Sequence, residues 1–187
     1  MKLIILEGIA TSGKTTIKNL LEKYLKTNNL NYQIIKEDET LMPIHKNTNK
    51  EIAKTHLNKI LNKYLKKNID YLIFDRLYFT HIHRTNSTLI DFKEIEIQLL
   101  KQNTQIIYLK INTNSIMKRI TNAMTHRTKS WGNYIKSLGN KTEIQNYYSN
   151  QQKTQTKYLK KTKIKNTIYN TTNLDFETIT KEIIKTL

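Results

Sequence analysis

The sequence reads Gly8-Ile9-Ala10-Thr11-Ser12-Gly13-Lys14-Thr15 close to its start, and this stretch decides the fold. It matches the pattern G-x-x-x-x-G-K-[S/T] without a gap, and it uses two of the four glycines of the chain. Glycine lets successive backbone N–H groups turn inward and approach a ligand closely. We therefore expect a phosphate-binding loop that extends to Thr16. Lys14 would bridge the β- and γ-phosphates of a nucleoside triphosphate, and the Thr15 hydroxyl would bind Mg²⁺.

The segments on either side of this stretch supply the context that the motif requires. Residues 2–6 form a short apolar run bounded by Gly8, which predicts a buried strand. Residues 15–25 carry apolar side chains at the spacing of an amphipathic helix. The N-terminus of that helix would add its partial positive charge to the phosphate site.

Further along the chain, predicted strands and helices continue to alternate. Apolar runs predict strands at residues 2–6, 32–35, 71–74, 105–111 and 164–169. Helical periodicity predicts helices at residues 15–25, 50–65, 91–100, 115–127 and 143–161, the last of them polar and on the surface. Thr172 and Asp175 form a capping-box pattern before one more helix, and residues 130–140 predict a loop or lid.

This alternation predicts an α/β fold in a single domain over residues 1–187. We expect a three-layer P-loop NTPase architecture with a five-stranded parallel sheet, helices on both faces and a lid at about residues 127–141. The ligand would then lie at the carboxyl ends of the strands.

Composition excludes several classes of protein and leaves one question open. The chain has no cysteine and no apolar run near the ~18 residues that span a membrane, so we expect a cytoplasmic protein without a membrane partner. The formal net charge is +17, and only Arg76, Arg84, Arg119 and Arg127 are arginines. Because the lysines are spread along the whole chain, we favour a solvated surface shaped by codon bias over a nucleic-acid footprint.

Asp75 and Arg76 follow the third predicted strand and form the second candidate site. A carboxylate at the end of a buried strand can hold Mg²⁺ through water, so we expect Asp75 to share the metal with Thr15. The Arg76 guanidinium would contact the phosphoryl acceptor or its phosphate through a bidentate fork. The alternative is an ordinary capping aspartate beside a surface arginine.

Together these motifs resemble the P-loop nucleoside and nucleotide kinases, in particular the thymidylate kinase and deoxynucleoside kinase branch. The resemblance rests on a strand that runs into EG-x(4)-GKTT, a third strand that ends in Asp-Arg, and a fourth strand that leads to an arginine-bearing helix. It implies an ATP- and Mg²⁺-dependent kinase with a small-molecule nucleoside or nucleotide acceptor, and it is compatible with a homodimer. Leu77 stands where thymidylate kinases usually have tyrosine, which leaves the branch open.

The resemblance also implies roles for three further residues. Arg119 and Arg127 would belong to the lid region, where cations fold over the transferring phosphoryl group. Glu37 would be the base that accepts the proton of a nucleoside hydroxyl, although Asp38 and Glu39 stand beside it and a solvated acidic turn is the alternative. A monophosphate acceptor would need cations here and no base.

Weaker candidates remain undecided from the sequence. His81 and His83 lack metal-ligand spacing, and Arg84 is the better candidate for an acceptor contact. Residues 41–43 predict either a wall of the base pocket or core, and residues 171–173 either an adenine contact or a capped turn. The competing function is a P-loop NTPase or switch that binds nucleic acid through its basic surface.

Overall fold

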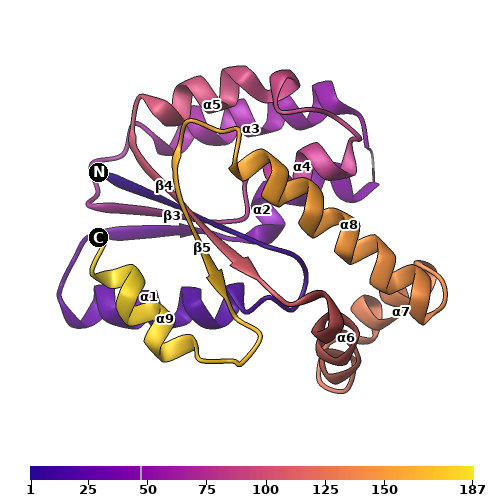
Figure 1. Ribbon diagram of the computed structural model, residues 1–187. Coiled ribbons are helices and arrows are strands. Elements are labelled where there is room, and N and C mark those ends of the chain that lie inside the picture. Colours follow the sequence, from indigo (N-terminus) through magenta and orange to yellow (C-terminus); the bar gives the residue numbers. More distant parts are fainter. Residues whose placement is uncertain (47) are drawn as a thin grey trace.

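A five-stranded parallel sheet forms the centre of the molecule, as the sequence predicts. The computed structural model describes residues 1–46 and 48–187. The strands are β1 (Lys2–Glu7), β2 (Tyr32–Ile35), β3 (Tyr71–Asp75), β4 (Asn103–Lys110) and β5 (Lys165–Asn170), in the spatial order β2-β3-β1-β4-β5 (Figure 1). Every neighbouring pair is parallel, so all carboxyl ends meet at one edge of the sheet.

Helices cover both faces of this sheet and complete the three layers (Figure 1). On one face α1 (Lys14–Thr27) and α9 (Phe176–Ile184) pack against Ile4 and Leu6 of β1. On the other face α3 (Lys50–Tyr64) and α5 (Lys93–Leu100) pack against Leu3 and Ile5. Successive strand residues point to opposite faces, so an uninterrupted apolar strand such as β1 can supply both cores.

A helical corner lies at the carboxyl ends of the strands. It consists of α6 (Ile116–Met124), α7 (Lys129–Ser137) and α8 (Lys141–Leu159), which share an apolar cluster built around Ile9, Ile111 and Ile135 (Figure 1). The short helix α4 (Phe79–Arg84) follows β3, and α2 (Glu37–Lys46) follows β2. These helices surround the edge of the sheet where the phosphate-binding motif lies. In the described residues no helix is long and apolar enough to cross a membrane.

Two local expectations change: the loop at residues 130–140 is wrong, and the alternative of a solvated acidic turn at residues 37–39 is excluded. Residues 130–140 are mostly helical rather than a loop, because Trp131, Ile135 and Leu138 follow helical spacing and the Thr128 hydroxyl caps the first turn. The acidic residues 37–39 begin α2 instead of forming a solvated turn, a place where the helix dipole favours negative charge.

A third correction concerns the caps of the last helices. Asp175 alone caps α9 by accepting a hydrogen bond from the Thr178 N–H, while the Thr172 hydroxyl accepts from the Asn112 N–H. The complete capping box lies instead at α8, where Asn140 and Glu143 exchange hydrogen bonds. Helix α6 also ends at Met124, so Arg127 lies beyond it.

Candidate active site

The predicted phosphate-binding loop joins β1 to α1 and has the backbone that its glycines permit. Gly8 and Gly13 both have positive φ, at 144° and 94°. A Cβ atom on Gly8 would lie 2.5 Å from the Leu109 carbonyl oxygen, and one on Gly13 would overlap the Phe176 ring. Other residue types would strain this conformation, which explains why two of the four glycines stand here.

Lys14 lies over this loop. Its Nζ donates to the carbonyl oxygens of Gly8 at 3.0 Å and Ile9 at 2.9 Å. Burial, together with the nearby Arg76 cation, lowers the pKa of Lys14 to about 7. The ammonium therefore lies where phosphate oxygens could replace two neutral carbonyl partners.

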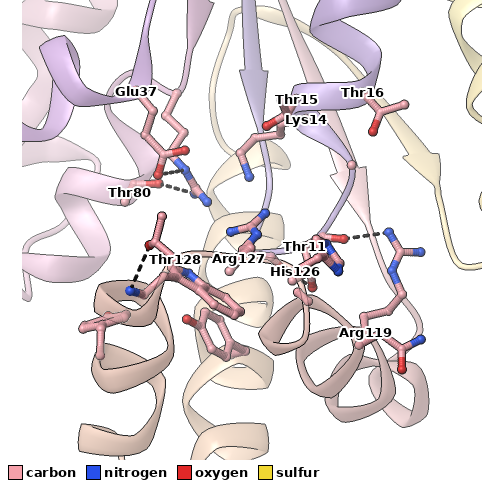
Figure 2. Close-up of a pocket in the computed structure, with 18 of the residues that line it drawn as sticks. Thr11, Lys14, Thr15, Thr16, Glu37, Thr80, Arg119, His126, Arg127 and Thr128 are labelled. Atoms are coloured by element: carbon pink, nitrogen blue, oxygen red, sulfur yellow. Dashed lines mark hydrogen bonds and ion pairs between the residues drawn. The ribbon is translucent and has the colours of Figure 1, made fainter.

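A cavity of about 790 Å³ extends to both sides of Lys14. Figure 2 shows Arg119 and Thr11 on one side, Glu37 and Thr80 on the other, and Arg127 between the two groups. We name the first side the donor compartment; its walls include Thr11, Arg119, Asn122, Leu174 and Phe176. We name the second the acceptor compartment; its walls include Glu37, Thr80, Arg84, Tyr147, Tyr148 and Gln151.

Arg76 and Glu37 form an ion pair at the boundary of the two compartments. The Arg76 backbone has a φ of 68°, and its Nε lies 2.9 Å from Glu37 Oε1. Its Nη1 donates to the Gly8 carbonyl at 2.6 Å. The same atom donates to the Thr80 hydroxyl at 3.0 Å (Figure 2). Burial alone would raise the pKa of Glu37, but the Arg76 and Lys14 cations lower it to about 2. Glu37 is therefore an ionised carboxylate that faces the cavity.

Glu7 is a buried residue of the site that sequence reasoning missed. Its Oε1 accepts hydrogen bonds from the N–H groups of Leu77 at 3.0 Å and Phe79 at 3.2 Å. Burial raises its pKa, although Arg76 acts in the opposite direction. Glu7 thus fixes the turn that carries Arg76, and the only available signal was an acidic residue at the end of an apolar strand.

The two predicted metal residues differ in their placement. Thr15 lines the cavity, whereas Asp75 is 3% exposed and does not. Asp75 Oδ2 accepts from Lys18 Nζ at 2.8 Å, a partner that sequence reasoning missed, while Oδ1 has no hydrogen-bond partner among the described residues. A hydroxyl and one carboxylate oxygen left without a partner are donors that Mg²⁺ accepts, so these residues fit the metal. No cluster of three metal-ligating side chains occurs within residues 1–46 and 48–187.

Arg119 and Arg127 occupy different parts of the cavity. Arg119 donates to the carbonyl oxygens of Thr171 at 3.0 Å and Thr11 at 2.7 Å, which holds it in the donor compartment. The Arg127 guanidinium lies 4.6 Å from the centre of the Trp131 ring at the start of α7. Of these two arginines, Arg127 is the one that lies between the two compartments (Figure 2).

Helix α8 forms as the sequence predicts, and one of its faces carries buried polar side chains that sequence reasoning missed. Gln152 exchanges two hydrogen bonds with the backbone of Ile111 at 2.8 and 2.9 Å. Gln155 accepts from the Tyr108 hydroxyl at 3.0 Å and donates to Thr80 at 3.4 Å. A polar residue such as glutamine is expected at the surface of a helix, so the sequence gives no signal that these glutamines are buried.

The structure places the weaker candidates of the sequence, at residues 41–43, 81, 83 and 171–173, in different surroundings. His81 is fully buried, and the His83 ring packs 5.5 Å from Tyr147. Leu41 belongs to the core and Met42 is exposed, whereas the side chain of Pro43 lies outside the described residues. The Thr171 hydroxyl donates to the Ser12 carbonyl at 2.9 Å, so the turn at residues 171–173 packs against the phosphate-binding loop and holds it in place.

Comparison with known proteins identifies the fold. Three solved structures are similar over 98% of this chain. The YorR protein from Bacillus subtilis with phosphorylated GDP is 20% identical, matches over 94% of its own chain and has a TM-score of 0.67. Deoxyadenosine kinase from M. mycoides with bound dATP is 19% identical over 98% of its chain with a TM-score of 0.59, and thymidylate kinase from Candida albicans is 15% identical over 89% of its chain with a TM-score of 0.58. These similarities show a P-loop kinase-like fold.

At the level of sequence, no curated protein matches this chain. Residues 1–133, which include the phosphate-binding loop, Glu37 and the Asp75–Arg76 pair, match the family model described as chromatin associated protein KTI12. That match covers well over half of the chain, and the protein therefore belongs to the KTI12 family, a P-loop kinase-like family.

Proposed function

We propose that this protein is an ATP- and Mg²⁺-dependent phosphotransferase that phosphorylates a hydroxyl of a nucleoside. The observation that carries the proposal is the continuation of the cavity beyond Lys14 into the acceptor compartment. An enzyme that transfers phosphate only to water has no need of a second walled compartment. A kinase needs one, because it must position an acceptor beside the terminal phosphate.

The polar groups at the compartment boundary favour a nucleoside over a nucleoside monophosphate. Arg76 contacts Gly8, Thr80 and Glu37 through Nη1 and Nε, so an acceptor phosphate at its guanidinium would compete with the Glu37 carboxylate. Glu37 would repel a phosphate dianion but can accept a hydrogen bond from a neutral hydroxyl. Arg84 also lines this compartment, and a monophosphate acceptor, as the thymidylate kinase neighbour's name suggests, is the alternative within the same reaction class.

Catalysis would consist mainly of positioning and electrostatics. Lys14 would exchange its loop carbonyls for the β- and γ-phosphate oxygens, and Arg127 would leave the Trp131 ring to contact the transferring group. Glu37 would orient the acceptor hydroxyl and take its proton late, which a loose transition state permits even for a carboxylate of low pKa. Mg²⁺, held near Thr15 and Asp75, would neutralise charge on the phosphates.

The decisive test is ADP release with Mg·ATP across a panel of nucleosides and nucleoside monophosphates, with water alone as the control. We expect stimulation by nucleosides, loss of turnover in Lys14→Ala, and a fall of at least 100-fold in kcat for Glu37→Gln. If only monophosphates stimulate release, the acceptor is a nucleotide and Glu37 is not a base. If nothing exceeds the water control, the kinase proposal fails.

A P-loop NTPase or switch that binds nucleic acid is the second candidate. Two observations favour it: the formal net charge of +17, and the description of the family as chromatin associated. Stimulation of ADP release by DNA or RNA, without phosphorylation of any small acceptor, would support this candidate over the first.

A further inference from the structure

Gln151 on α8 is a buried residue whose side chain has no hydrogen-bond partner among the described residues. It is 4% exposed and lines the acceptor compartment, and nothing in the described part of the chain hydrogen-bonds its amide. Gln152 and Gln155, on the same helix, are both hydrogen-bonded. The Gln151 amide atoms are not among the fully buried side-chain atoms that lack a partner, so they open into the cavity, where water or a ligand can bond them. The observation points to a ligand.

The neighbours of Gln151 place it between two distinct parts of the compartment. Gln155, one turn further along α8, bonds Thr80, which in turn accepts from Arg76. Gln151 lies one turn before Gln155 on α8 and lines the same cavity as Arg76 and Glu37. On its other side are Tyr147 and Tyr148, whose ring centres are 5.1 Å apart. Gln151 therefore shares one cavity with the Arg76–Glu37 pair and with two tyrosine rings.

We infer that Gln151 is a specificity-determining residue that binds a neutral group of the acceptor, one that offers a hydrogen-bond donor and an acceptor together. The inference rests on the proposed function and names the part of the acceptor that the acceptor compartment recognises by hydrogen bonds. A primary amide carries two donors, one acceptor oxygen and no charge, so it complements a base edge or a sugar hydroxyl and does not compensate a phosphate dianion. The tyrosine rings beside it suit the flat face of a nucleobase.

The test compares Gln151→Met with Gln145→Met, a control on the same helix outside the cavity. Calorimetry would measure nucleoside binding to each protein with a non-hydrolysable ATP analogue already bound. We expect Gln151→Met to weaken nucleoside binding at least tenfold and to leave affinity for the ATP analogue within twofold. The control should match the wild-type protein in both measurements.

Two comparisons of ligands show whether the neutral group that Gln151 binds is a sugar hydroxyl or a base edge. If the amide binds a sugar hydroxyl, Gln151→Met will bind a nucleoside and its 2′,3′-dideoxy form equally, whereas the wild-type protein prefers the former. If the amide binds a base edge, the variant will lose its preference among bases and keep its preference for the hydroxyls. Either pattern supports the inference.

Other results overturn it and separate it from the proposed function. Nucleoside affinity that is equal in wild type and Gln151→Met would overturn the role of Gln151 and leave the kinase proposal intact. Absence of nucleoside binding to the wild-type protein would overturn both. A melting temperature below that of the control would also count against the inference, because it would show that the amide stabilises the fold; we expect an equal or higher value.

Discussion

At the scale of single residues, the Lys14 ammonium bonds two loop carbonyls in the place where phosphate oxygens would bind. Its pKa of about 7 should return toward 10.5 when anionic phosphates replace these neutral partners. At pH 8 the free protein would hold about 0.1 proton at Lys14, so ATP binding should take up about 0.9 proton. Calorimetry in buffers of different ionisation enthalpy measures this uptake. The Lys14→Met protein should show almost none at pH 8, and an unchanged uptake would contradict the assignment.

The Lys18–Asp75 pair gives a second prediction at this scale. Its side chains are 15% and 4% exposed, so removal of either partner leaves a charge in a poorly solvated place. We expect Lys18→Met to lower the free energy of unfolding by about 3 kcal/mol. The double variant with Asp75→Asn should lose less than the sum of the single losses, by about 2 kcal/mol. Urea denaturation of the four proteins completes the cycle, and additive losses would show that the pair contributes little.

At the scale of elements, neighbouring glutamines on α8 should respond in opposite ways. Gln152 bonds both the N–H and the carbonyl of Ile111, so Gln152→Leu leaves two buried backbone groups unpaired and should cost about 3 kcal/mol. Gln151→Met removes an amide that has no hydrogen-bond partner among the described residues, so it should not lower the free energy of unfolding. Denaturation of both variants beside Gln145→Met measures the contrast. A similar loss in both would mean that α8 is held by its polar face as a whole.

Helix α7 carries the only tryptophan of the chain, which makes its surroundings observable. The Arg127 guanidinium lies 4.6 Å from the centre of the Trp131 ring. If Arg127 turns to the phosphates, the indole loses a cation from its face, and its emission should change when ATP and acceptor bind. In Arg127→Met the emission should differ at the start and respond weakly to ligands. A full response in that variant would show that α7 moves without Arg127.

The sequence predicted the elements whose local physics is unambiguous. Strands such as β1 and β3 are apolar runs, and the phosphate-binding loop needs glycine where φ is positive, so both could be found without tertiary information. Helices α2 and α7 were missed because Asp38 and Gly132 belong to residue types that are also common in turns. The Lys18–Asp75 contact spans 57 residues, and no local pattern could indicate it. The buried face of α8 was missed because a glutamine can be buried only where hydrogen-bond partners meet it, and the partners of Gln152 and Gln155 lie far away in the sequence.

At the scale of the whole molecule, the net charge of +17 separates the two candidate functions. If the charge is a solvated surface, DNA and RNA should bind without sequence preference, with Kd values of about 1–100 µM at physiological salt. Binding should then weaken more than tenfold between 50 and 200 mM salt, because it depends on released counterions. Fluorescence anisotropy with labelled oligonucleotides measures both quantities, and ADP release should be the same with and without the oligonucleotide. A Kd that stays below 1 µM in 0.5 M salt, together with faster ADP release, would mean that the surface recognises nucleic acid and would favour the switch over the nucleoside kinase.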